Sequence, residues 1–170
     1  MLARPILVAY ASRHHGTEEM AVEIADALRG AGFEVELCAA ADVLTIEPYG
    51  AIIVGSAVYM FQWESPALEL VRRERLALAE RHVWLFSSGP VGDGKSTRHP
   101  ETVPHPNGVD QLAAEIGARG LAMFGGRVDS NQGGFAMAIM AKAGLEGDWR
   151  DLPRVRSWAL EIAAILRADD

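Results

Sequence analysis

The chain has little cysteine, few basic residues and no long apolar run. Cys38 is the only cysteine, so the chain has no internal disulfide and no thiolate metal cluster. This fits a reducing compartment, and we expect a cytoplasmic protein. No segment reaches the roughly 18 consecutive apolar residues of a membrane span. The N-terminal apolar stretch is short and continues directly into the fold pattern, so we do not expect it to be a signal peptide.

Positive charge is in deficit, with 16 Lys and Arg against 23 Asp and Glu and a net charge of −7. Polyanions bind to basic surfaces, so we expect no nucleic-acid partner. Hydrophobic residues make up 49% of the 170 residues and are spread evenly. That length and composition predict one globular domain over residues 1–170, without a linker or an internal repeat.

Apolar β-rich runs alternate along the chain with segments of helical spacing. Thr17, followed by two acidic residues, is typical of a helix N-terminus. The alternation predicts a parallel sheet with helices on both faces. The expected strands are 5–12, 33–38, 50–57, 82–88 and 121–126, and the expected helices are 17–31, 65–81, 111–118 and 153–167. The inward-facing candidates are Met20, Ile24, Ala27 and Leu28 in the first helix and Leu68, Val71, Leu76 and Leu78 in the second.

In open parallel sheets, ligands bind beyond the carboxyl ends of the strands, where the strand order reverses. That rule selects residues 12–17, 56–63 and 87–94. We expect a nucleotide-like ligand to touch all three loops.

Residues 89–96, GPVGDGKS, match the GxxxxGKS pattern of Walker-type phosphate loops. Such loops need a helix that starts at the Lys-Ser pair and points its positive end at the phosphate. Here Pro100, Pro104 and Pro106 follow and exclude a regular helix. The match is therefore interpreted as accidental, and no ATP or GTP site is predicted.

Residues 12–17, SRHHGT, are the better phosphate candidate, because a strand-to-helix loop directs its amides and the helix dipole at one anion. Ser12 and Thr17 add hydroxyls, and Arg13, His14 or His15 can add positive charge. The alternative is a polar turn with a threonine cap. No metal site is predicted, since no cysteine or carboxylate cluster joins the adjacent histidines.

Several stretches together resemble the flavodoxin family, and most closely the flavodoxin-domain proteins related to menaquinone-dependent protoporphyrinogen oxidase. The resemblance implies a three-layer, doubly wound α/β sandwich with a five-stranded parallel sheet of order 2-1-3-4-5. The stretches are VAYASRHHGTEEMAVEIADAL, YGAIIVGSAVYMFQW, HVWLFSSGPVGD, FGGRVD and GDWRDLPRVRSWA.

The resemblance implies FMN as the cofactor, with its phosphate in the first loop. Ser12 and Thr17 match the ends of the family pattern, but His15 stands where glycine is usual, and Gly16 can supply part of the missing backbone freedom. Tyr59 is expected to stack on the ring, with Met60 and Trp63 as neighbours; the alternative is that Tyr59 and Trp63 pack against the following helix. The implied FMN contacts are Ser12, Arg13, His14, His15, Gly16, Thr17, Ala57, Val58, Tyr59, Met60, Ser88, Gly89, Pro90, Val91, Gly92 and Asp93.

The resemblance also implies redox chemistry, for which three interpretations stay open. The first is an oxidoreductase that moves electrons between an organic substrate and a quinone or other acceptor. The second is a shuttle between redox proteins, and the third is a binding module that has lost FMN. Propionate groups of a tetrapyrrole substrate would need basic residues, for which Arg98, His99, Arg127 and Lys142 are candidates.

Residues 127–150 contain an apolar, Met-rich core at 134–145, in a region where oxidase-like relatives carry an insertion. This core would serve as a lid over a hydrophobic substrate, an access route for a quinone or a peripheral membrane contact. Alternatively, it forms a helix packed on the sheet or against the second subunit of a homodimer. The Met-rich core favours the oxidoreductase over the shuttle.

Overall fold

A parallel sheet forms the middle layer of the protein in the computed structural model, which describes residues 4–89, 104–129 and 135–169. Its strands lie in the order β2-β1-β3-β5-β6, and the short strand β4 pairs antiparallel with β3. Counted along the chain, the five parallel strands have the predicted order 2-1-3-4-5. Their bounds are Ile6–Ala11 (β1), Val35–Ala39 (β2), Ala51–Tyr59 (β3), His82–Gly89 (β5) and Gly120–Gly125 (β6), with Gln62–Trp63 as β4.

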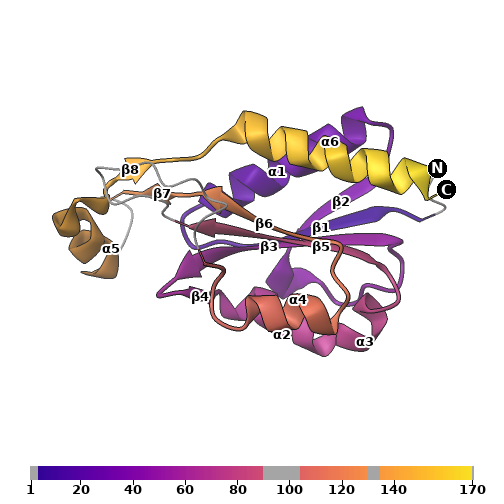
Figure 1. The fold of residues 1–170 in the computed structure, drawn as a ribbon, viewed down its shortest axis with the longest axis horizontal. Coiled ribbons are helices and arrows are strands. Elements are labelled where there is room, and N and C mark those ends of the chain that lie inside the picture. Colours follow the sequence, from indigo (N-terminus) through magenta and orange to yellow (C-terminus); the bar gives the residue numbers. More distant parts are fainter. Residues whose placement is uncertain (1–3, 90–103, 130–134, 170) are drawn as a thin grey trace.

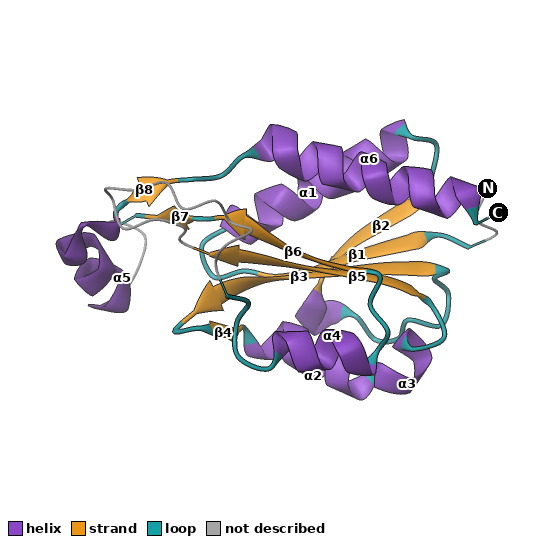
Figure 2. Ribbon diagram, in the orientation of Figure 1, coloured by secondary structure: helices purple, strands orange, loops and turns teal. Residues whose placement is uncertain are grey.

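Helices cover both faces of this sheet (Figures 1 and 2). On one face lie α1 (Gly16–Gly30) and α6 (Leu152–Ala168), which pack against each other and the sheet. On the other face lie α2 (Ser65–Arg73), α3 (Arg75–Leu78) and α4 (Val109–Glu115), and the 3-10 turn η1 (Ala40–Asp42) follows β2. Each face has its own cluster of buried apolar side chains, so the predicted doubly wound sandwich is confirmed.

The first helix has the predicted inward face, and the second has it except at Leu76. Met20, Ile24, Ala27 and Leu28 are all buried, as the helical spacing indicated. The expected helix 65–81 is instead interrupted at Glu74, which has φ −95° and ψ 8°. The interruption changes which residues face the sheet. Val71 and Leu78 are fully buried and Leu68 is half-buried, but Leu76 is 75% exposed, so the prediction for Leu76 was wrong.

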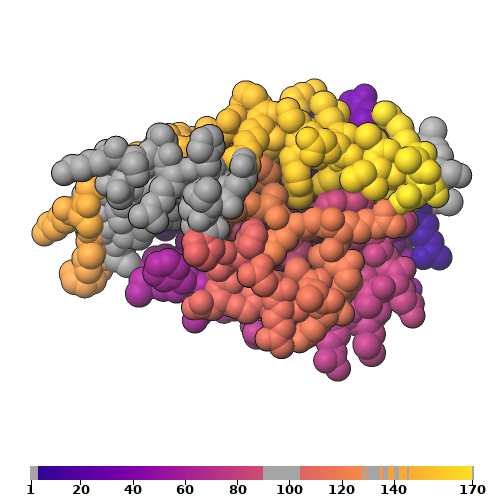
Figure 3. Space-filling view, viewed as in Figure 1, coloured from indigo at the N-terminus to yellow at the C-terminus, as the bar shows by residue number. Residues whose placement is uncertain are grey.

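The chain between β6 and α6 leaves the body of the sandwich. Strands β7 (Arg127–Val128) and β8 (Gly147–Asp148) pair antiparallel and flank the helix α5 (Phe135–Met140) and the π-helical segment η3 (Ala141–Leu145). Figure 1 shows α5 projecting beyond the end of the sheet, and in the space-filling view of Figure 3 this segment lies at one end of the molecule. Phe135 is 84% exposed and Ile139 is 51% exposed. The alternative of a helix packed on the sheet is therefore wrong for these two side chains.

Among the described residues, no helix is both long enough and apolar enough to cross a membrane.

Candidate functional site

The three predicted loops leave the sheet side by side. In the parallel register Ala11 is opposite Ser56, and Ala57 is opposite Ser88, so β1, β3 and β5 end next to one another. Of the predicted site residues, Ser12 to Thr17, Ala57 to Met60, Ser88 and Gly89 lie at this edge. Pro90, Val91, Gly92, Asp93 and most of the Walker-type match fall outside the described residues, as do Arg98 and His99.

The first loop turns into helix α1 at His15. His15 has φ 61° and ψ −8°, the left-handed conformation for which glycine is usual. Gly16 is the first helical residue and does not have a positive φ. The expectation that Gly16 supplies the backbone freedom is therefore wrong, because the turn occurs one residue earlier. A Cβ built on Gly16 would meet nothing within 4 Å, so open space lies beside it.

Thr17 has the most informative side chain in the first loop. It is 1% exposed, and its Oγ1 is buried without a hydrogen-bond partner. The alternative of a threonine cap is therefore wrong, since this hydroxyl bonds no backbone amide of the helix. An unsatisfied buried hydroxyl costs about 1–3 kcal/mol, which a bound group with hydrogen-bonding atoms would recover.

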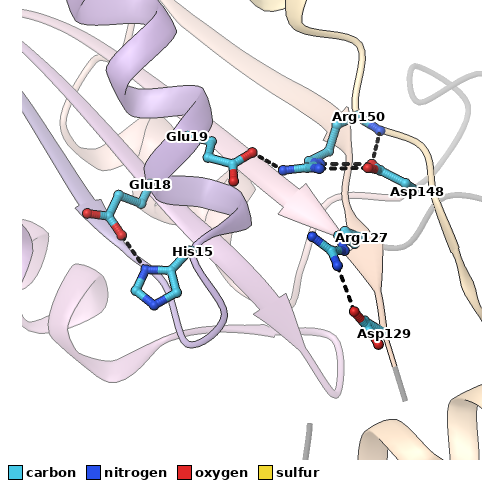
Figure 4. A network of polar contacts seen from close by, with 7 residues as sticks. All are labelled: His15, Glu18, Glu19, Arg127, Asp129, Asp148 and Arg150. Carbon is cyan, nitrogen blue, oxygen red and sulfur yellow. Dashed lines mark hydrogen bonds and ion pairs between the residues drawn. The ribbon is translucent and has the colours of Figure 1, made fainter. Parts of the chain in front are cut away.

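The two carboxylates in the first turn of α1 are both engaged (Figure 4). Glu18 accepts from His15 Nδ1 at 2.6 Å and from the Tyr10 hydroxyl at 3.0 Å, and these hydrogen bonds hold the pKa of Glu18 below its ordinary value. Burial, followed by the bond to Glu18, raises the pKa of Tyr10. Glu19 pairs with Arg150. Paired with a guanidinium, Glu19 repels an incoming anion less than a free carboxylate would.

Arg150 also ties the β7–β8 excursion to the start of α1. Its guanidinium bonds Asp148 on β8 and Glu19 on α1, and it holds the pKa of Asp148 below its ordinary value. The candidate cation Arg127 pairs with Asp129 at 2.6 Å within the excursion, and Lys142 is exposed on η3. Sequence reasoning missed Arg150, because nothing local links it to a glutamate 131 positions away.

The second loop is a tight turn between β3 and β4, with Tyr59 opposite Gln62. Its two central residues, Met60 and Phe61, have φ values of 51° and 60°, which side-chain-bearing residues adopt at a cost. Their side chains are 74% and 77% exposed. Sequence reasoning selected Met60 and missed Phe61, although both lie in the same aromatic-rich stretch.

Trp63 belongs to the core and not to the exposed loop. It is 3% exposed, and its Nε1 donates to Ser87 Oγ at 2.7 Å. Trp63 belongs to the same buried apolar cluster as Ala67 and Leu70 of α2, so the alternative of packing against the following helix is confirmed for Trp63. The bond to β5 anchors the second loop to the base of the third.

Arg13 joins the first loop to the second. Its Nε donates to Glu64 Oε2 at 2.8 Å, and its guanidinium carbon lies 4.7 Å from the centroid of the Tyr59 ring. Glu64 is fixed in turn, since its amide donates to the buried Ser56 Oγ at 2.9 Å. Arg13 therefore contacts both ends of the loop that carries Met60 and Phe61.

The third loop begins with backbone in close approach to its neighbours. Gly126 N donates to Gly89 O, and a Cβ built on Gly126 would lie 2.9 Å from the Gly89 carbonyl carbon. A Cβ on Gly89 would lie 3.2 Å from Val58 Cβ. Glycine is required at position 126, because main chain lies directly against main chain there, whereas a side chain at position 89 would press on Val58.

The family model described as "Flavodoxin domain" matches residues 7–144. The chain belongs to the flavodoxin-domain family. A search among curated protein sequences gives no match.

Solved structures share the fold of this flavodoxin domain at low sequence identity. A flavodoxin from the domain Archaea is 16% identical with a TM-score of 0.60, and the match covers 96% of this chain and 99% of that one. For the two-electron reduced flavodoxin of Megasphaera elsdenii the identity is 21%, the TM-score 0.57 and the coverage 82% and 98%. The rubredoxin oxygen:oxidoreductase of Desulfovibrio gigas is 17% identical with a TM-score of 0.64, and the match covers 97% of this chain but 37% of that one.

Proposed function

We propose that this flavodoxin domain binds FMN across the three loops and acts as an FMN-dependent oxidoreductase between an organic substrate and a quinone or other acceptor. The observation that carries the proposal is the Thr17 hydroxyl, which is buried without a partner in the first turn of α1.

The residues present fit the phosphate of FMN. Ser12 and Thr17 supply hydroxyls, and α1 directs the positive end of a 15-residue helix at the same loop. His15 has the backbone conformation that the family pattern assigns to glycine, so the substitution does not remove the turn. This argues against the module that has lost FMN.

The fit of the ring rests on Tyr59 and on the backbone at Ser88 and Gly89. Tyr59 offers an aromatic face at the end of β3, and the small residues Ser88 and Gly89 at the end of β5 allow main chain to approach a flat ligand. FMN, when bound, supplies the electron-transfer chemistry, while the protein orients the flavin and controls access to it.

Exposed apolar side chains favour an organic reaction partner. Met60 and Phe61 on the second loop and Phe135 and Ile139 on α5 are each at least half exposed. The excursion that carries α5 is held to the start of α1 by Arg150. Large exposed apolar groups beside a site are typical of surfaces that bind apolar molecules.

The shuttle between redox proteins is the second candidate. The observation in its favour is that single-domain flavodoxins match almost end to end, with 96% of this chain and 99% of the archaeal protein covered. The structure described as two-electron reduced flavodoxin is also similar. A shuttle would use the same FMN site, so both candidates share the first test.

That test is the visible absorbance spectrum of the purified protein, before and after FMN is added and the unbound flavin is removed. We expect flavin bands to be retained at about one FMN per chain, as one phosphate loop permits. A protein that holds no FMN would contradict both the oxidoreductase and the shuttle.

Thr17→Val tests the residue on which the proposal rests. Loss of a hydrogen bond to a charged group should raise the FMN Kd at least about tenfold. The free energy of unfolding without FMN should be unchanged or higher, because the variant removes an unsatisfied buried hydroxyl. Thr17→Ser keeps the hydroxyl and should retain most of the affinity. Equal FMN binding by the valine and wild-type proteins would exclude Thr17 from the site.

Substrate choice is tested by turnover of the FMN-loaded protein with protoporphyrinogen and with menaquinone analogues. A rate above that of free FMN supports the oxidase-like proposal. If reduction of a redox-protein partner is fast and no organic substrate turns over, the shuttle is favoured.

A further inference from the structure

We propose that Arg13 positions the flavin ring through Tyr59 and does not bind the phosphate, although it lies in the phosphate loop. The inference rests on the proposed FMN site and assigns a role within it. Sequence position alone would suggest a phosphate-binding cation, but the contacts of the side chain point the other way.

The first contact is the ion pair with Glu64. The Glu64 side chain is only 10% exposed, whereas that of Arg13 is 55% exposed. Among the described residues, Arg13 is the cation bonded to this carboxylate, at 2.8 Å. Removing the cation would leave a poorly hydrated carboxylate without compensation, which opposes transfer of Arg13 to a phosphate.

The second contact is with the Tyr59 ring. The guanidinium carbon lies 4.7 Å from the ring centroid, within the range of a cation–π interaction. Tyr59 is half-buried and directly precedes the left-handed pair Met60–Phe61. Arg13, held by Glu64, lies over one face of the Tyr59 ring. This contact fixes the orientation of the ring, and the opposite face of Tyr59 can then stack on the flavin.

The phosphate has donors that do not involve Arg13. The Thr17 hydroxyl is unpartnered, and the N-terminus of α1 directs its dipole at the loop. Arg13 is therefore available to position the ring. Its removal should weaken the binding of a flavin whether or not the flavin has a phosphate.

The experiment compares FMN with riboflavin, which has the same ring and no phosphate. Both are titrated by flavin fluorescence against the wild-type protein, Arg13→Gln and Glu64→Gln. Arg72→Gln, an exposed arginine on α2, controls for the loss of one positive charge. We expect Arg13→Gln to raise both Kd values by the same factor, about three- to tenfold. Glu64→Gln should act in the same direction, and Arg72→Gln should leave both values unchanged.

A double-mutant cycle identifies the route of the effect. In a Tyr59→Ala background, Arg13→Gln should have no further effect on either flavin, because the residue through which it acts is gone. An effect that persists there would show that Arg13 acts directly and would overturn the proposal.

Three other outcomes would also overturn it. Weaker binding of FMN alone would make Arg13 a phosphate ligand. Tighter binding of both flavins would mean that Arg13 covers the face of Tyr59 that the ring needs, and unchanged binding would remove any role. If the wild-type protein binds neither flavin, the proposed function itself fails. If the wild-type protein binds FMN, the proposed function stands, and the outcomes above test only the role of Arg13.

Discussion

His15 holds a left-handed backbone conformation directly before α1, where its imidazole also bonds Glu18 at 2.6 Å. A residue with a side chain pays about 1 kcal/mol or more for this conformation. The strain lies beside the unpartnered Thr17 hydroxyl, so the costly features of the loop occur together at the proposed phosphate site. Strain of this kind clusters at functional sites.

His15→Val and Gly16→Ala test which of the two adjacent residues has the left-handed backbone conformation. His15→Val should lower the free energy of unfolding by about 1–2 kcal/mol, since a β-branched residue is poorly tolerated at positive φ. Gly16→Ala should change it by no more than about 0.5 kcal/mol, because Gly16 is helical and its Cβ would enter open space. Chemical denaturation of the FMN-free protein measures both. The opposite order would place the left-handed turn at Gly16.

At the scale of elements, a main-chain hydrogen bond and an arginine attach the β7–β8 excursion to the sandwich. Trp149 N donates to Gly126 O, and Arg150 bonds both Asp148 and Glu19. A Cβ on Gly125 would lie 2.2 Å from Trp149 O, so glycine is needed where the returning chain crosses β6. The attachment sets the position of the exposed α5 relative to the proposed site.

Arg150→Gln should release this attachment and change a titration. Arg150 is the main cause of the lowered pKa of Asp148, so the variant should raise that pKa toward its ordinary value of 3.8. Stability due to this pair is present above that value and is lost as the pH falls through the lower native pKa. NMR titration of Asp148 and amide exchange in β7 and β8 are the measurements. Arg127→Gln, in the same excursion, should shift the pKa of Asp148 less, and an equal shift would contradict the assignment.

At the scale of the whole molecule, a buried tyrosine in one of the two core clusters links stability to pH. Tyr49 is 7% exposed, and its hydroxyl donates to Glu36 Oε2 at 2.6 Å. Burial, and then the bond to Glu36, raises the pKa of Tyr49 from 10.0 to about 12. The native protein therefore keeps this proton at a pH at which the unfolded chain has lost it.

The free energy of unfolding should fall as the pH rises from 10 to about 12, because the stabilisation from protonated Tyr49 is complete below the unfolded pKa and is lost through the native one. Tyr49→Phe should flatten this slope. Tyr10 and Cys38, whose pKa values are also raised mainly by burial, contribute in the same direction. Denaturation at a series of alkaline pH values measures the slope. An unchanged slope in the phenylalanine variant would show that Tyr49 does not contribute.

By itself, the sequence determined the alternation of strands and helices, the inward face of α1 and the three loops at the edge of the sheet. These follow from local patterns, because apolar periodicity selects the buried face of each element and parallel strands end at a common edge. The family resemblance added the strand order, which the tertiary structure confirms.

Only the tertiary structure decided how particular side chains are used. The helix is interrupted at Glu74, and Leu76 is exposed. The left-handed turn is at His15 and not at Gly16. Trp63 is buried in the core and donates a hydrogen bond to Ser87. Arg13 reaches Tyr59 and Glu64, and Arg150 reaches Glu19, across separations of 46, 51 and 131 positions. Partners so far apart in the chain meet only after the strands between them have paired, so no local pattern in the sequence records the contact.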